Sequence, residues 1–147
     1  MGMKFLTRVP FVELLGMQLQ HFGGGEAEVL LPLREELTNS WSVAHGGVMM
    51  TLLDVAMAHA ARSPDPATGE LPPGVVTVEM KTSFMRPGIG TLAARGKLLH
   101  KTASMAFCEG SVQDEQGGLL AHATATFKYM KGLPAGGRNI KRLNASD

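Results

Sequence analysis

Apolar and polar positions in the first quarter of the chain follow two different spacings. Residues 10–16, PFVELLG, place a proline in a first helical turn and a glycine at the end, which predicts a short helix. Residues 17–21 and 26–33 alternate between apolar and polar side chains around three glycines, so we expect a β-hairpin with a glycine turn. Residues 34–44 form a polar loop that carries the only tryptophan, Trp41.

A long apolar segment then occupies residues 46–62. Before Arg62, the polar or ionisable side chains in it are Thr51, Asp54 and His59. The segment has no proline and is rich in alanine and leucine, which predicts a helix. A helix that is apolar nearly all round must be enclosed by other structure. Residues 63–73, SPDPATGELPP, have the composition of a loop, so we expect the helix to end before them.

The rest of the chain has the two-residue period of β-strands. Residues 75–85 alternate, with Val76, Val78, Met80 and Phe84 expected on one face of the strand and Thr77, Glu79, Lys81 and Ser83 on the other. Residues 91–99, 105–112 and 119–129 follow after short polar or glycine-rich turns. Spacings this short predict an antiparallel meander joined by hairpins.

These elements predict an α+β fold class, with one long helix packed on five or six mainly antiparallel strands. We find no internal repeat, so the chain is expected to be a single domain, residues 1–147. Its core would span about residues 10–130, and residues 131–147 would form a partly disordered, solvated tail with Arg138, Lys141 and Arg142.

Composition narrows the function classes. The net charge of +1 gives no electrostatic case for a nucleic-acid partner. The one cysteine, Cys108, excludes an internal disulfide and lies in an apolar stretch, where it is expected to pack as a small hydrophobe. No signal peptide or membrane-spanning stretch is found, so the expected compartment is the cytoplasm, with no membrane partner. The histidines show no metal-ligand spacing, and no metal is predicted.

Asp54 is the most anomalous residue of the apolar helix. A carboxylate there costs several kcal/mol unless it is paired, hydrogen-bonded or beside a wet cavity. His59 lies five positions further on, on a different face, and is a poor partner for it. The alternative is that Asp54 caps a neighbouring backbone group. We favour a functional role.

The sequence Asn39-Ser-Trp-Ser-Val-Ala-His45-Gly46-Gly47 leads into the same helix. A helix N-terminus exposes unpaired N–H groups and favours an oxyanion, and glycines let a ligand carbonyl approach the backbone closely. A thioester carbonyl against the N–H of Gly46 or Gly47 would be polarised. The alternative is a plain glycine-rich helix start with His45 near the N-cap.

Geometry adds a constraint on these two features. Gly46 and Asp54 are eight positions apart, about 12 Å along a helix, so one reacting carbonyl cannot touch both. If both act on one substrate, they must come from two copies of the helix that run antiparallel. The chemistry therefore predicts a homodimer with two composite sites.

Asn39, His45-Gly46-Gly47 and Thr51-Leu52-Leu53-Asp54, with residues 76–80 and 84–88, resemble the phenylacetate-degradation (PaaI) type of hotdog thioesterase within the 4-hydroxybenzoyl-CoA thioesterase superfamily. The resemblance covers roughly residues 16–130. It implies a hotdog fold and hydrolysis of an acyl-CoA thioester, with coenzyme A as part of the substrate and no other cofactor. Dimers that pair into a homotetramer are common in that family.

The resemblance also implies site roles. Gly46 would give its backbone N–H to the thioester oxygen, and Asp54 of the partner chain would act as general base or nucleophile. Asn39 would orient substrate or water, Thr77 would help to hold the attacking water, and His45 would either orient the loop or transfer protons. Gly47 would also contact the substrate.

For the polyanionic coenzyme A, the candidate contacts are Arg86, Lys101 and Ser104, although each could be an ordinary surface side chain. Two other functions stay open. One is an acyl-CoA-binding protein without turnover. The other is a hotdog hydratase or dehydratase, a group that has prolines after the His-Gly region which this chain lacks.

Overall fold

The computed structural model describes residues 2–133; the tail predicted from residue 131 onward lies almost wholly outside the described residues. The described part contains two α-helices, one 3-10 turn and six strands. Their bounds are α1 Pro10–Leu15, β1 Gln18–Gly23, β2 Glu26–Pro32, η1 Glu35–Leu37, α2 Gly46–Ala61, β3 Gly74–Phe84, β4 Thr91–Lys101, β5 Met105–Gln113 and β6 Leu119–Met130. The short helix, the hairpin, the long helix and the four later strands are thus confirmed.

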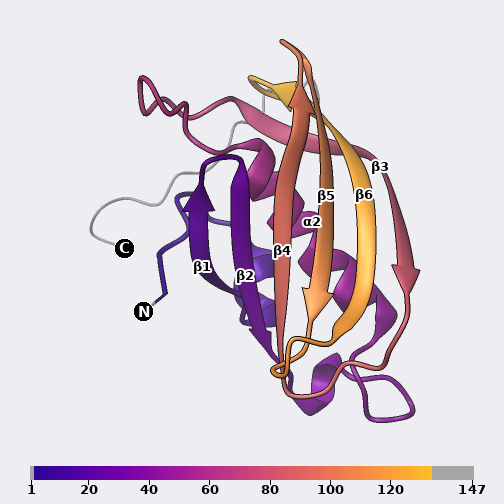
Figure 1. Cartoon of the computed structure of the whole chain (residues 1–147). Coiled ribbons are helices and arrows are strands. Elements are labelled where there is room, and N and C mark those ends of the chain that lie inside the picture. The colour runs from indigo at the N-terminus through magenta and orange to yellow at the C-terminus, as the bar shows by residue number, and fades with distance from the viewer. Residues whose placement is uncertain (1, 134–147) are drawn as a thin grey trace.

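The six strands form one antiparallel sheet in the order β1-β2-β4-β5-β6-β3, and α2 lies against one face of it (Figure 1). The predicted α+β class is confirmed. The predicted meander holds only for β4, β5 and β6, because β3 pairs with β6 and not with β4. The chain enters α2 after β2 and leaves it at the opposite edge of the sheet. As a result β3 is an edge strand, and the next strand, β4, returns to pair with β2.

Helix α2 lies closest to the sheet at two glycines. Gly96 of β4 and Gly110 of β5 are paired in register and buried. A Cβ on Gly96 would collide with the carbonyl group of Ala56 and lie 2.7 Å from the amide nitrogen of Met57. A Cβ on Gly110 would lie 3.0 Å from the Met57 side chain. Glycine inside a strand is typical of such close backbone approach, and here it sets the depth at which α2 packs.

A bulge in β3 changes the strand faces that alternation predicts. Thr77 pairs with Phe127 and Glu79 with the next residue, Thr126, so Val78 has no counterpart on β6. Because Phe127 points into the core, Thr77 faces α2. After the bulge Met80, opposite Ala125, faces α2 as well. The prediction that Val76, Val78, Met80 and Phe84 share one face is therefore wrong, since the extra residue reverses the alternation.

The two sides of α2 differ in burial. The sheet-facing side is sealed in the core by residues such as Leu52, Leu53 and Met57, all at 0% exposure. The other side carries a stripe that is half-buried or exposed, which we call the open stripe: Gly46, Gly47, Met50, Thr51 and Asp54. The expectation that α2 is enclosed all round thus holds for only part of the helix. No helix in residues 2–133 has the length and apolarity to cross a membrane.

Candidate active site

The carboxylate of Asp54 is held by a side chain of β3. The Thr77 hydroxyl donates a hydrogen bond of 2.7 Å to Asp54 Oδ1 within the same protomer. The bulge at Val78 supports this contact, because it lets Thr77 and Met80 both face the helix. Thr77 was expected near the attacking water from the resemblance alone. Its direct bond to Asp54 spans 23 positions, and no pattern in the sequence indicates it.

Burial of Asp54 raises the pKa of its carboxyl above the ordinary value of 3.8, and the hydrogen bond from Thr77 acts in the opposite direction. A base is most effective when its pKa lies near the working pH, so the shift suits a carboxylate that must accept a proton. His59, the alternative partner, is occupied elsewhere. Its Nδ1 lies 2.7 Å from the carbonyl oxygen of Val55, and its ring packs edge-on against Phe5 and Phe22.

The two glycine amides at the start of α2 differ in their hydrogen bonding: the Gly47 N–H is used in the N-cap, and the Gly46 N–H is not. His45 is the N-cap, and its Nδ1 accepts a hydrogen bond of 2.9 Å from the Gly47 N–H. The imidazole proton therefore sits on Nε2 in this arrangement. Among the described residues, no acceptor bonds the Gly46 N–H. Of the two candidate amides, Gly46 is thus the one left for a ligand, while Gly47 is used by His45.

Gly46 and Asp54 lie on the same open stripe but in different parts of the helix. They are the first and ninth residues of α2, and the eight-residue separation amounts to about 12 Å of helix rise. The ring of Phe84, at the end of β3, covers Gly46 from the side: a Cβ on Gly46 would lie 3.6 Å from it. Phe84 is 48% exposed and was not given a role from the sequence. The aromatic contact beside the glycine is the feature that sequence reasoning missed.

Asn39 shapes the loop in front of α2. Its Oδ1 accepts hydrogen bonds from the backbone N–H of Trp41 at 2.9 Å and of Val43 at 3.4 Å. Its own backbone N–H donates to the Val43 carbonyl. The oxygen of the Asn39 amide is therefore occupied, and only the amide NH₂ is available to orient a substrate or a water.

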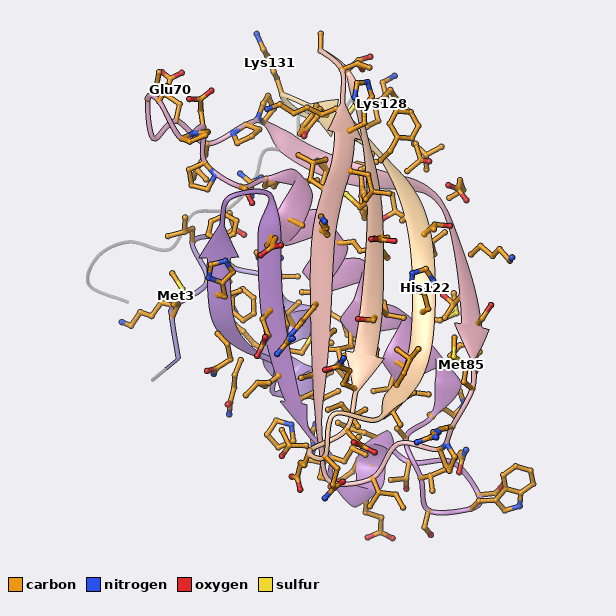
Figure 2. The ribbon with its side chains drawn as sticks, viewed as in Figure 1. Met3, Glu70, Met85, His122, Lys128 and Lys131 are labelled. Atoms are coloured by element: carbon orange, nitrogen blue, oxygen red, sulfur yellow. The ribbon has the colours of Figure 1, made fainter. Side chains whose placement is uncertain are left out.

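The three candidate coenzyme A contacts do not come together within the chain. Arg86 follows β3 at the end of the sheet where β6 begins, and its backbone N–H donates to the Leu120 carbonyl, whereas Lys101 and Ser104 lie at the β4–β5 turn. Figure 2 shows the two ends: Met85, next to Arg86, at the lower end and Lys128, which pairs with Met105, at the upper end. Lys101 also lines an open groove with Asp65 and Glu70, whose charges oppose a phosphate there.

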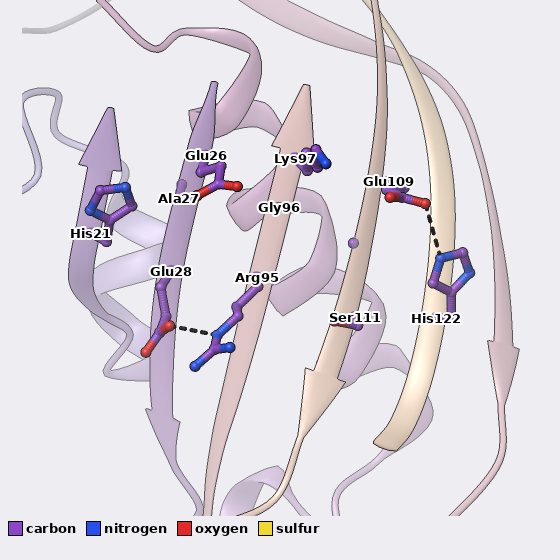
Figure 3. Close-up of a pocket in the computed structure, with 11 residues that line it drawn as sticks. His21, Glu26, Ala27, Glu28, Arg95, Gly96, Lys97, Glu109, Ser111 and His122 are labelled. Atoms are coloured by element: carbon purple, nitrogen blue, oxygen red, sulfur yellow. Dashed lines mark hydrogen bonds and ion pairs between the residues drawn. The ribbon is translucent and has the colours of Figure 1, made fainter. Parts of the chain in front are cut away.

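The other face of the sheet carries a separate polar groove of about 420 Å³. An ion pair between Glu28 and Arg95, at 2.7 Å, crosses it, and the carboxylate of Glu109 lies 3.5 Å from Nε2 of His122 (Figure 3). This groove lies on the far side of the sheet from α2, so it does not include Asp54. Cys108 lies in the core, where burial raises the pKa of its thiol to about 12, so it is not a nucleophile.

A central helix on a curved antiparallel sheet, with a half-buried carboxylate on that helix, defines a hotdog-type enzyme architecture. The thioesterase superfamily matches residues 42–121, from the loop before α2 to the start of β6. The chain belongs to this superfamily and is a thioesterase, a hydrolase, by family and relatives.

Individual relatives agree with this assignment. Medium/long-chain acyl-CoA thioesterase YigI of Escherichia coli is 27% identical over 139 residues, which cover 86% of this chain and 89% of YigI. The solved structure of protein PA5202 from Pseudomonas aeruginosa is 28% identical, with a TM-score of 0.76 and coverage of 85% and 97%. A mutant of PaaI from Thermus thermophilus is 29% identical, with a TM-score of 0.70 and coverage of 83% and 100%. The resemblance to the PaaI type is thereby confirmed.

Proposed function

We propose that this protein hydrolyses an acyl-CoA thioester to a free acid and coenzyme A, with Asp54 as the group that activates water. The observation that carries the proposal is the half-buried Asp54 carboxylate, held by Thr77 on the open stripe of α2. The printed activity of YigI, an acyl-CoA thioesterase, supports coenzyme A as the thiol. We expect no metal or redox cofactor, because the water can be activated by a carboxylate alone.

The active unit is a two-fold dimer in which Gly46 of one protomer meets Asp54 of the other. Within one protomer the two groups are too far apart to share a carbonyl. Among the described residues β3 pairs only with β6, so its outer edge is available for a second β3. Val78, Phe84 and Met85 along and beyond this strand are each about half exposed, at 54%, 48% and 52%. Pairing two β3 strands antiparallel covers these side chains and sets the two α2 helices antiparallel.

The reaction then proceeds by addition and elimination. The Gly46 N–H donates to the thioester oxygen, where negative charge develops. Asp54 accepts a proton from water while the water oxygen bonds to the carbonyl carbon. The tetrahedral intermediate collapses, the carbon–sulfur bond breaks, and the coenzyme A thiolate leaves with the proton that Asp54 returns. Thr77 positions Asp54, and His45 holds the helix start, so both act through the groups they contact.

The same symmetry unites the coenzyme A contacts. Antiparallel pairing of β3 brings Arg86 of one protomer to the end of the sheet where Lys101 and Ser104 of the other lie. A basic cluster for the phosphates thus forms only in the dimer. Asn39 and Gly47 remain at the helix start, beside the thioester. Pairing of two such dimers into a tetramer belongs to the same proposal.

The test is thiol release by the wild type and by Asp54→Asn across aryl, short, medium and long acyl-CoA esters. We expect release of coenzyme A by the wild type without an enoyl product, and a loss of kcat of at least about a thousandfold in the variant, with coenzyme A binding retained. Glu26→Gln, at an exposed carboxylate at the start of β2 on the far face of the sheet from α2, is the matched control and should keep wild-type turnover. Unchanged turnover in Asp54→Asn would contradict the mechanism. Binding without turnover by the wild type would indicate the carrier function, and an enoyl product would indicate the hydratase.

A second experiment separates general-base attack from a covalent route. In the covalent route, Asp54 attacks the carbonyl and forms an anhydride, which water then opens. Single turnover in heavy-oxygen water, followed by mass analysis of the peptide that contains Asp54, distinguishes the two. We expect label only in the acid product. Label in Asp54 after one turnover requires the anhydride.

A further inference from the structure

Met50 is unusual among the apolar residues of α2. It is half-buried, yet it does not belong to the hydrophobic core that takes up Met49 and Met57, nor to the partly buried residues packed against that core, such as Val55. It lies on the open stripe one helical turn before Asp54, since residues four apart share a face. An apolar side chain that neither fills the core nor lies fully in water is placed to contact something outside its own protomer.

Symmetry fixes where Met50 lies in the dimer, and this step rests on the proposed function. If Gly46 faces Asp54 of the partner across antiparallel helices, Asp54 faces Gly46 of the partner. Position 50 is halfway between the two. Met50 therefore lies beside its own copy on the two-fold axis, about 6 Å along each helix from either carboxylate.

The direction of the substrate follows from the two ends of the site. The coenzyme A arm extends from Asp54 toward the end of the sheet with Lys101 and Ser104, beyond the C-terminal end of α2. The acyl group on the other side of the carbonyl carbon is directed toward the N-terminal half of α2, where Met50 is the next large apolar side chain of the open stripe.

We propose that Met50 and its symmetry copy form one shared apolar wall that closes both acyl pockets and limits the length of the acyl group. A methionine suits this position, because its flexible thioether adapts to chains of different shape. Met49 and Met57, the other methionines of α2, are 4% and 0% exposed and belong to the hydrophobic core. They are part of the core and do not contact the substrate.

The first test is the acyl-length profile of kcat/KM for Met50→Ala and Met50→Phe, measured from butanoyl- to hexadecanoyl-CoA and for a series of ω-phenyl esters. Met50→Ala opens the wall, so esters longer than the wild-type optimum should gain about tenfold relative to that optimum. Met50→Phe should shift the optimum to shorter esters. Met3→Ala is the matched control at a half-exposed methionine near β1 and should leave the profile unchanged.

A second test reports the position of Met50 independently of turnover. Met50→Cys treated with a short bis-maleimide should give a covalent dimer, and Met3→Cys should not. The background is low because Cys108 is buried and its thiol pKa is raised to about 12.

The outcomes separate this inference from the proposed function. Profiles of both Met50 variants that parallel the wild type, or no covalent dimer from Met50→Cys, would overturn the shared wall, while an inactive Asp54→Asn would still support the hydrolase mechanism. Full turnover in Asp54→Asn, or no hydrolysis of any ester by the wild type, would remove the proposed function and the wall together.

Discussion

The two sides of α2 show how one helix serves stability and chemistry at once. On the sheet side, Gly96 has no side chain, so the backbone at Ala56 and Met57 packs directly on β4. On the open stripe, burial raises the pKa of the Asp54 carboxyl. Its side-chain partner is the Thr77 hydroxyl, which donates a hydrogen bond to it. The first side tolerates no added atom. The second side keeps a partly buried carboxylate and, at Gly46, a backbone amide that has no protein acceptor among the described residues.

This difference shows that the packing requirements of α2 fall on its sheet side and its chemical groups on the open stripe. Positions one or two residues apart on α2, such as Leu53 and Asp54, belong to different environments. Substitutions on the sheet side should therefore change unfolding and leave the chemistry of folded molecules intact. Substitutions on the open stripe should change turnover or pH dependence and leave folding nearly intact.

After the loss of kcat in Asp54→Asn, the largest expected effect is that of removing the backbone N–H of Gly46 on the open stripe. Gly46→Pro removes the N–H, and proline suits the first position of a helix after the extended His45, whose φ is −62° and ψ 137°. We expect kcat to fall about a hundredfold to a thousandfold, as when one oxyanion donor is removed. Gly46→Ala keeps the N–H and is the control. A proline variant with full kcat and an unchanged melting temperature would exclude this amide as the oxyanion donor.

A stability effect of about 2–3 kcal/mol is expected on the sheet side. Gly96→Ala inserts a Cβ into the backbone of α2 at Ala56, and overpacking against main chain cannot be relieved by a rotamer change. Denaturant unfolding measures the loss, with Gly2→Ala as a glycine substitution away from α2. If Gly96→Ala unfolded like the wild type, the close packing of α2 on β4 would be refuted.

A smaller effect, about tenfold in kcat/KM, is expected at the contact between β3 and the open stripe. Thr77→Val removes the hydrogen bond that lowers the Asp54 pKa, so that pKa should rise further above 3.8. Because the base must be ionised, the acid limb of the pH profile of kcat/KM should move to higher pH. Thr77→Ser keeps the hydroxyl and should restore the wild-type limb. An identical limb in Thr77→Val would argue that the bond is absent in solution.

The smallest expected effect is a gain in stability of about 1 kcal/mol in Asp54→Asn at neutral pH. A carboxyl with a raised pKa in the folded state binds its proton more tightly when folded, so stability is lost as the pH rises through that pKa. The asparagine variant lacks this loss and still accepts the Thr77 hydroxyl. Its melting temperature should exceed that of the wild type at neutral pH, and the gap should close at acid pH. A lower melting temperature at neutral pH would contradict the burial of charge at Asp54.

Local patterns in the sequence were sufficient for most of the fold. The two-residue period located the strands to within about two residues, and the apolar run from Gly46 located α2. The anomalous Asp54 was visible because a carboxylate stands out in an apolar helix. Gly46 and His45 were visible because they stand at its start.

The strand bulge, the edge position of β3 and the close packing of α2 depend on contacts between distant segments, which local sequence patterns do not encode. The bulge at Val78 occurs inside residues 76–81, which alternate without interruption, so nothing there indicates that Thr77 and Met80 share a face. The edge position of β3 follows from the path of the chain through α2. In the sequence, Gly96 looks like any small residue of a strand. Its role in letting α2 pack closely on β4 is seen only in the folded structure.

The absent side chain at Gly96 also limits how this lineage can change over evolutionary time. Any residue that drifts into that position must push the helix outward, and the carboxylate that α2 carries would move with it. The range of substrates can therefore change more readily through residues that leave the spacing between α2 and the sheet, and with it the position of Asp54, unaltered. At Gly96 it is the absence of any atom beyond Cα that restricts which residues the position can accept.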